Sequence, residues 1–487
     1  MNRWDLILHS IGVVFSAVLL YYAFDIDSLG WIFAVGAFVL YFQIISVQKK
    51  RISVRLWFHI LFILSFVILQ YSFIIKLAFE YDLLSLTILL IIALMYLLPI
   101  VILDTLSTDY GVEVFSISFL MAEYMFVNSP IGNQMFQLGV VLADNVIFSQ
   151  FCEYTGPWGG SAWIIFESYC LYRVLNGDFY KLKSGIIVFL LTLIVNMMIL
   201  NNLQTEMDDD VTITAASLLE SNDIDSLLLT YDKTSDYLLL PEATKIIHGK
   251  GLATDPFMTY LYRLSDKTKS HIVAGIYVYE GDIRYNKVYG IKENICFSRG
   301  KSILVPFAEY LPFSSSLNNF VTKISQILPH PTHKYDNKEE IYSDVNVKYA
   351  PIICYEALFT DYISDLCRKG AELIFVSSSN TFIGDDHIES VNQKIIRMNA
   401  VVARRCFVRA TEYGRSFFIN RDGGINKECK YKSCFLTSNV EINSENTIYV
   451  LYGNLISHLY ILLLMIAFVS IMRRIYCQSG DNLMKFN

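Results

Sequence analysis

Three polar residues in the second half of the chain together carry the groups needed for nucleophilic acyl transfer. Cys354 follows an apolar run and supplies a thiol, Glu242 follows Leu240-Pro241 and supplies a carboxylate, and Lys301 supplies an ammonium. A thiol can attack a carbonyl carbon while a carboxylate accepts its proton and a fixed cation stabilises the resulting oxyanion. These residue types therefore predict catalysis through a thioester, with Glu242 as base.

Each of the three residues also has an ordinary structural interpretation. A lone cysteine after a strand is often a small buried hydrophobic residue, a glutamate after a proline is often a solvated acid, and most lysines lie on the surface. Against this, Tyr355 follows the cysteine at an expected strand end, where its backbone N–H is placed to donate to an oxyanion. Glu309 lies shortly after Lys301 and is expected to hold that lysine in place.

The composition predicts a membrane protein without a metal, a cofactor or a nucleic-acid partner. Of 487 residues, 54% are hydrophobic and 17% are charged, which is too apolar for a typical soluble enzyme. The net charge of −7 comes without a basic stripe, which argues against nucleic acid. The nine cysteines lack metal-site spacing, and His330 and His333 lie in a Pro-rich loop without acidic ligands. Only Cys429 and Cys434 are spaced to form a disulfide, and two free thiols are the favoured interpretation.

Long apolar stretches predict about eight membrane spans. The clear ones are 6–24, 29–47, 56–79, 84–103, 185–200 and 451–472, and weaker ones lie at 115–147 and 162–175. Basic residues near three span ends place those ends in the cytoplasm: Lys49-Lys50-Arg51, Lys181 with Lys183, and Arg473-Arg474. The resulting domains are 1–203 with about seven spans, 204–447 as a polar domain on the outer face, and 448–487 as a final span with a cytoplasmic tail. If 115–147 lies at the interface instead, the polar domain moves to the cytoplasm.

Within the polar domain, short apolar runs alternate with helical patterns after a solvated linker at 205–210. The expected strands are 237–240, 272–279, 350–354, 373–377, 407–410 and 416–419, and the expected helices are 361–368 and 388–405. This alternation predicts stacked α and β layers around one core. The segment 311–342 lacks periodicity, follows the lysine directly and is interpreted as a candidate gate over the site.

In this order and on this topology, the motifs resemble those of the apolipoprotein N-acyltransferases, which are membrane members of the nitrilase (carbon–nitrogen hydrolase) superfamily. The motifs that carry the resemblance are Leu240-Pro241-Glu242-Ala243, Lys301 with Leu304-Val305-Pro306-Phe307-Ala308-Glu309-Tyr310, Ile353-Cys354-Tyr355-Glu356, Ser379-Asn380 and Val408-Arg409-Ala410-Thr411 with Gly414 and Ser416. In the membrane part, Gln150 and Thr155-Gly156 with Gly159 are similar to a family stretch. The resemblance implies a nitrilase-like α-β-β-α sandwich domain beside a multi-pass helical domain.

The resemblance also implies a ping-pong reaction at a membrane surface. Glu242, Lys301 and Cys354 would form the catalytic triad, with Glu309, Tyr355, Glu356 and Asn380 behind it. The thiolate would take an acyl chain from a phospholipid, and the N-terminal amine of a diacylglyceryl-cysteine lipoprotein would accept it. The implied location is the bacterial inner membrane, multi-pass, with the catalytic domain on the periplasmic face.

The chain departs from the family pattern around the triad. The family's acid and Trp-Phe-Gly run after Ser379-Asn380 is here Thr381-Phe382-Ile383-Gly384, and an Arg-Ala-x-Glu element is here Asn399-Ala400-Val401-Val402. Glu412 stands where an asparagine is expected, and Ala308 replaces a usual glycine. These changes bear on the acyl acceptor, so the alternative is a membrane-anchored carbon–nitrogen hydrolase or acyltransferase with another amine acceptor. A third reading, an inactive scaffold or transporter-like protein, is disfavoured by the intact triad and by the few charges within most spans.

Overall fold

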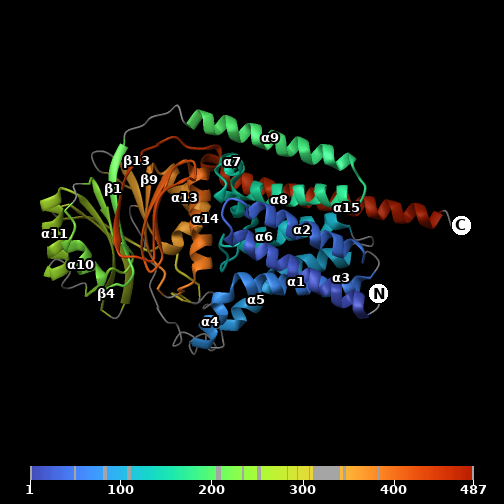
Figure 1. The fold of residues 1–487 in the computed structure, drawn as a ribbon, viewed down its shortest axis with the longest axis horizontal. Coiled ribbons are helices and arrows are strands. Elements are labelled where there is room, and N and C mark those ends of the chain that lie inside the picture. Colours follow the sequence, from blue (N-terminus) through green and yellow to red (C-terminus); the bar gives the residue numbers. More distant parts are fainter. Residues whose placement is uncertain are drawn as a thin grey trace. The chain divides into compact units, whose positions relative to one another are not determined.

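The structure, a computed structural model, divides the chain into two compact units (Figure 1). One comprises residues 1–199 and 452–487, and the other comprises residues 200–451. The described residues are 3–48, 51–80, 85–106, 111–203, 210–232, 235–248, 254–281, 283–292, 294–306, 308–310, 340–343, 347–381 and 383–484. The candidate gate at 311–342 and the histidines at 330 and 333 lie largely or wholly outside them.

The first unit is helical. Its elements are α1 (Arg3–Asp25), α2 (Gly30–Ser46), α3 (Ile52–Gln70), α4 (Ser72–Glu80), α5 (Ser85–Leu106), α6 (Val112–Val127), the 3₁₀ helix η1 (Leu138–Asp144), α7 (Val146–Ser149), α8 (Cys152–Leu175), α9 (Tyr180–Leu203) and most of α15 (Ile448–Met484). Helix α8 kinks at Gly156-Pro157, where Gly156 has a φ of 63° and the proline cannot continue the hydrogen-bond ladder.

Among the described residues, five helices are long and apolar enough to cross a membrane. They are Arg3–Asp25, Ile52–Gln70, Leu86–Thr105, Tyr180–Leu203 and Ile448–Arg473, and α2 is a shorter apolar helix. Only 6% of the apolar window is buried in each of the last two, as expected for surfaces that contact lipid. The count of about eight spans therefore stays a prediction. The weaker span expected between 115 and 147 also stays a prediction: α6 ends at Val127, and irregular backbone leads from it into η1 and α7.

A buried polar cluster joins α2, α3 and α5. Arg55 donates to the Asp104 carboxylate over 3.1 Å, and the Tyr41 hydroxyl lies 2.6 Å from Nδ1 of His59. Nε2 of His59 lies 3.8 Å from the same carboxylate of Asp104. A charge inside an apolar helical bundle is costly unless it is paired, so we infer that this cluster holds the three helices together.

The second unit contains the strands. They are β1 (Asp210–Leu218), β2 (Tyr237–Leu239), β3 (Lys245–His248), β4 (His271–Glu280), β5 (Ile283–Lys292), β6 (Asn294–Gly300), β7 (Tyr342–Ser343), β8 (Lys348–Ile353), β9 (Leu373–Ser379), β10 (Cys406–Glu412), β11 (Arg415–Ile419), β12 (Ile425–Lys430) and β13 (Cys434–Glu441). Its helices are α10 (Asp223–Leu229), α11 (Pro256–Thr268), the 3₁₀ helix η3 (Cys354–Leu358), α13 (Thr360–Arg368) and α14 (Asp386–Ala403).

The strands run along the order β6-β5-β4-β2-β1-β10-β9-β8-β7. The pairs from β4 through β2, β1, β10 and β9 to β8 are parallel, whereas β5 and β6 continue antiparallel from β4. Strand β13 pairs antiparallel with β1 over its whole length. Consequently, the carboxyl ends of β2, β10, β9 and β8 meet at one edge of the sheet.

Three cores define four layers, with α10 and α11 on one side of the strands and α13 and α14 on the other (Figure 1). The central core packs side chains of β2 and β4 against those of β8 and β9, so the strand path closes on itself. One outer core lies between β2, β4 and helices α10 and α11, and the other between β8, β9 and helices α13 and α14. The predicted α-β-β-α arrangement is confirmed.

All the predicted strands and both predicted helices are present, but several strands went unpredicted, including the central β1. The predicted linker at 205–210 ends where β1 begins, at Asp210. The expectation of two free thiols at Cys429 and Cys434 is wrong: the structure pairs them in a disulfide. A tight turn between β12 and β13 brings these cysteines together.

Candidate active site

Polar residues gather where parallel strands end. Glu242 follows β2, Cys354 follows β8, Ser379 is the last residue of β9 and Glu412 is the last residue of β10. Because these strands are parallel neighbours in one sheet, their carboxyl ends present these side chains at a single edge. Lys301 follows the antiparallel strand β6, so it approaches the same place from another part of the sheet.

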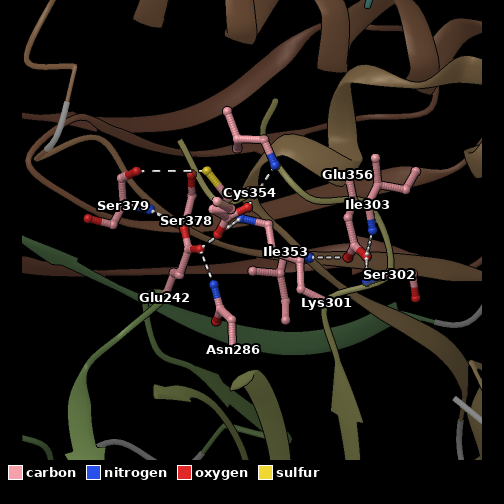
Figure 2. Close-up of polar contacts among 12 residues, drawn as sticks. Glu242, Asn286, Lys301, Ser302, Ile303, Ile353, Cys354, Glu356, Ser378 and Ser379 are labelled. Atoms are coloured by element: carbon pink, nitrogen blue, oxygen red, sulfur yellow. Dashed lines mark hydrogen bonds and ion pairs between the residues drawn. The ribbon is translucent and has the colours of Figure 1, made fainter. Parts of the chain in front are cut away.

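The Glu242 carboxylate is buried, and both of its oxygens accept hydrogen bonds. Its Oε1 accepts from Nδ2 of Asn286 over 2.6 Å and from Nζ of Lys301 over 3.2 Å, and its Oε2 accepts from the Ser379 N–H over 3.0 Å (Figure 2). Gly275 on β4 makes this close packing possible, since a Cβ there would lie 2.7 Å from Cα of Glu242. The carboxylate is thus held at the strand ends. It is not the solvated acid that the residues around it in the sequence also allowed.

Lys301 is buried between two carboxylates. Its Nζ lies 3.2 Å from Glu242 and 3.0 Å from Glu309, and Glu309 also accepts from the Val305 N–H over 2.8 Å. The charges of Glu242 and Glu309 raise the pKa of Lys301 well above its usual value, although burial alone would lower it. The ammonium is therefore a fixed cation, and Glu309 lies behind it as the sequence suggested.

We expect Lys301→Met to slow acyl-enzyme formation by about 100-fold to 1,000-fold, because the oxyanion loses a fixed cation. Methionine keeps the length of the side chain without its charge. The rate is measured as the mass increase of the full-length protein after mixing with phospholipid. Lys245→Met, which removes a half-buried lysine paired with the exposed Asp225, is the matched control. A folded Lys301→Met protein that reacts at the wild-type rate would contradict the role of the cation.

Cys354 lies in a strained turn directly after β8. Its φ of 48° is unusual for a residue with a side chain, and Ala243, just after Glu242, has a φ of 56°. The Cys354 thiol is directed at the backbone oxygen of Ser379, with 3.7 Å between Sγ and O (Figure 2). Burial, followed by the charge of Glu242, raises the pKa of Cys354 to about 12, although Lys301, Ser378 and Arg409 act in the opposite direction. In the resting site the group is a neutral thiol, so attack requires a base.

A buried ion pair ties the cysteine turn to the lysine turn. The guanidinium of Arg299 forms two bonds to the Glu356 carboxylate, of 2.7 and 2.9 Å. The same carboxylate accepts from the N–H of Ser302 over 2.7 Å and from the N–H of Ile353 over 2.7 Å (Figure 2). One side chain therefore fixes the residues next to Lys301 and next to Cys354.

Arg299→Met is expected to destabilise the protein by about 3–5 kcal/mol, because it leaves the buried carboxylate of Glu356 without its cation. The double variant Arg299→Met/Glu356→Gln should lose less than the sum of the two single variants, since the stranded charge is then absent. The measurement is thermal or denaturant unfolding of the full chain in detergent. Additive losses would mean that the two side chains are not energetically coupled.

A second buried ion pair supports the cysteine from the side of β10. The guanidinium of Arg409 forms bonds of 3.0 and 2.9 Å to Glu389 and donates to the Ser378 hydroxyl over 2.9 Å. Glu389 also accepts from the Arg415 N–H over 2.9 Å. This network places a positive charge near Cys354 and orders the end of β9, where both Ser378 and Ser379 lie.

The structure also locates the remaining predicted residues. The Tyr355 ring packs edge-on against Phe359 at 5.1 Å, and the role of its backbone N–H stays a prediction. Asn380 is buried; its backbone N–H donates to the Glu412 carbonyl over 3.0 Å, and its Nδ2 has no partner among the described residues. His387 lies in the first turn of α14. Among the described residues, no group of three or more His, Cys, Asp or Glu could hold a metal ion.

Sequence reasoning missed Asn286 and Arg299 and gave Arg409 no role. Asn286 lies in the middle of β5 and carries no local signal, whereas Arg299 stands two residues before Lys301 in a segment without a clear strand pattern. One signal was available in the sequence: Arg299 and Arg409 are charged residues that lie within or beside runs of strand-forming residues. A charge that is fully buried in a sheet needs a partner, and here each arginine has one.

Comparison with known proteins identifies the family of this unit. Residues 228–449 match the family described as Carbon-nitrogen hydrolase. This segment, slightly less than half of the chain, is similar to carbon–nitrogen hydrolase domains. Curated relatives bear the name predicted from the motifs: the chain is 23% identical over 236 residues to the "Apolipoprotein N-acyltransferase" of Haemophilus influenzae, covering 45% of this chain and 44% of that protein. It is 26% identical over 235 residues to the protein of the same name from Pasteurella multocida, covering 47% and 43%.

These alignments span less than half the length of either curated relative. Among solved structures, Saccharomyces cerevisiae Nit3, described as a member of branch 10 of the nitrilase superfamily, is 14% identical with a TM-score of 0.35, covering 48% of this chain and 91% of that one. The segment that matches the carbon–nitrogen hydrolase family includes Glu242, Lys301 and Cys354, and together with the names of the curated relatives it confirms the resemblance seen in the motifs.

Proposed function

We propose that this chain is a membrane-embedded N-acyltransferase that moves an acyl chain from a phospholipid to the N-terminal amine of a diacylglyceryl-cysteine lipoprotein. The observation that carries this function is the convergence of Glu242, Lys301 and Cys354 at one edge of the sheet. The names of the curated relatives support the class of reaction. Apolar helices with exposed surfaces support delivery of that chemistry to lipid.

The first half-reaction forms the acyl-enzyme. Glu242 takes the proton from the Cys354 thiol as the sulfur attacks the acyl carbonyl carbon, and the oxyanion develops beside the ammonium of Lys301. The carbon–oxygen ester bond then breaks. The leaving alkoxide takes the proton from Glu242, which yields a lysophospholipid and a Cys354 thioester. The raised pKa of Cys354 fits this order of events, because the thiol keeps its proton until the base removes it.

The second half-reaction transfers the acyl chain to the amine. The amine nitrogen attacks the thioester carbon, a carbon–nitrogen bond forms, and the carbon–sulfur bond breaks. Glu242 accepts a proton from the nitrogen and returns it to the sulfur. An acceptor and a donor that both reside in a bilayer favour a site on the outer face of the bacterial inner membrane, as the basic clusters predicted.

The deciding experiment is mass spectrometry of lipoprotein N-termini from cells that lack this chain. Accumulation of diacyl forms, reversed by the wild-type gene, is the expected result. Unchanged triacyl forms would reject the lipoprotein acceptor and favour a carbon–nitrogen hydrolase or acyltransferase that acts on another amine. Purified full-length protein incubated with phospholipid vesicles should in addition gain the mass of one acyl chain.

A further inference from the structure

Glu412 is a second carboxylate at the proposed active site. It is the last residue of β10, it is buried, and its register partner on β9 is Ser379. The hydroxyl of Ser379 donates to Oε2 of Glu412 over 3.3 Å. The next residue, Tyr413, has a φ of 49°, so this strand ends in the same kind of strained turn as those at Glu242 and Cys354.

Ser379 connects this carboxylate to the reacting groups. Its N–H donates to Glu242 over 3.0 Å, its carbonyl oxygen lies 3.7 Å from the Cys354 sulfur, and its hydroxyl reaches Glu412. The same hydroxyl lies 3.1 Å from that of Thr381, which is an exposed contact. Ser379 therefore joins the half-buried thiol of Cys354 to the buried carboxylate of Glu412, and its hydroxyl also reaches the exposed Thr381.

The surroundings of Glu412 suit a positively charged ligand. Among the described residues Glu412 forms no ion pair, whereas Glu242, Glu309, Glu356 and Glu389 each have a cation. Burial, followed by the charge of Glu242, raises the pKa of Glu412, although hydrogen bonds from Ser379 and Ser221 act in the opposite direction. A carboxylate with a raised pKa is a better acceptor for an ammonium proton. The backbone N–H of Asn380 donates to the Glu412 carbonyl over 3.0 Å and so holds the end of β10 against the end of β9.

We infer that Glu412 is a specificity-determining residue that binds the acyl acceptor as an ammonium ion and removes its first proton. This inference rests on the proposed function, because it assigns the acceptor of that same site to the class of primary amines that are protonated at neutral pH. The ammonium loses one proton to Glu412, directly or through the Ser379 hydroxyl, and becomes a neutral amine. That amine attacks the thioester carbon, its second proton passes to Glu242 and then to the sulfur, and Glu412 releases its proton to solvent.

The test separates the two half-reactions in the full-length protein, with Glu412→Gln as the variant. Acyl-enzyme formation is followed by mass after mixing with phosphatidylethanolamine vesicles, and acyl-enzyme decay is then followed with two nucleophiles. One is a synthetic diacylglyceryl-cysteinyl peptide, whose amine is largely protonated at neutral pH, and the other is hydroxylamine, which is uncharged there. We expect Glu412→Gln to slow decay with the peptide at least tenfold more than decay with hydroxylamine. Its rate with the peptide should rise at higher pH, where solvent removes the first proton.

Two further variants serve as controls for the Glu412→Gln protein. Asp266→Asn removes an exposed carboxylate on α11 that pairs with Lys269, and it should behave like wild type with both nucleophiles. Glu412→Asp should recover part of the peptide rate because it restores the charge. Equal slowing with both nucleophiles, or no slowing with either, would overturn the inference while leaving the proposed function in place. A wild-type protein that forms no acyl-enzyme would instead overturn the proposed function and this inference with it.

Discussion

Replacing Cys354 by alanine is expected to abolish the acyl-enzyme and to reduce overall acyl transfer by at least about three orders of magnitude. The Cys354 thiol contacts the carbonyl oxygen of Ser379, and the charges of Glu242 and Lys301 both act on it. Without the sulfur, no covalent intermediate forms, and the remaining residues cannot split the transfer into two steps. Mass spectrometry of the intact protein after incubation with phospholipid measures this directly.

The control for this variant is another cysteine of the same domain. Cys367 is buried on α13 and belongs to the outer core, so Cys367→Ala removes a thiol without touching the strand ends. It should cost stability but still acquire the acyl mass. An acyl adduct on the Cys354→Ala protein, at the wild-type rate, would refute the assignment of the nucleophile.

Glu242→Gln is expected to slow acyl-enzyme formation by about two to four orders of magnitude, because the thiol then has no base within reach. The same change should lower the pKa of Cys354 from about 12, since the negative charge of Glu242 is one of the causes that raise it. The fraction of thiolate at a given alkaline pH is therefore higher in the variant, even though catalysis is lost. In the variant the thiolate fraction of Cys354 rises while the rate of acyl-enzyme formation falls. This combination distinguishes a base from a carboxylate with only a structural role.

The thiolate is measured by ultraviolet titration of each protein, with the corresponding Cys354→Ala background subtracted to remove the tyrosines and the other thiols. Glu280→Gln, at the half-exposed end of β4 where it pairs with Lys287, is the matched control and should leave both quantities in place. A Glu242→Gln protein whose Cys354 pKa rises, or whose acylation rate is retained, would show that Glu242 is not the base.

The sequence predicted those parts of the fold that leave a local pattern. Strands β2, β8 and β9 are short apolar runs, and their hydrophobicity is the direct result of burial on both faces in a parallel sheet. Strand β1 escaped prediction although it is central, because its small and hydroxyl-bearing residues, such as Thr214 and Ser217, give little hydrophobic signal. Strand β5 escaped because the adjacent polar residues Asn286 and Lys287 break its alternation of apolar and polar residues.

The sequence by itself predicted which residues could carry the chemistry and which apolar runs they adjoin. Glu242 and Cys354 each follow an apolar run that predicted a strand, so their positions at strand ends could be read from neighbouring residues. Lys301 was expected only to precede a buried apolar run, and the strand that it follows, β6, was not predicted. Only the tertiary structure decided how they are held: Asn286 on Glu242, Arg299 on Glu356, and Ser379 between Glu242 and Glu412. These contacts join segments far apart in the chain, and they depend on strand order and register, which hydrophobic periodicity does not encode.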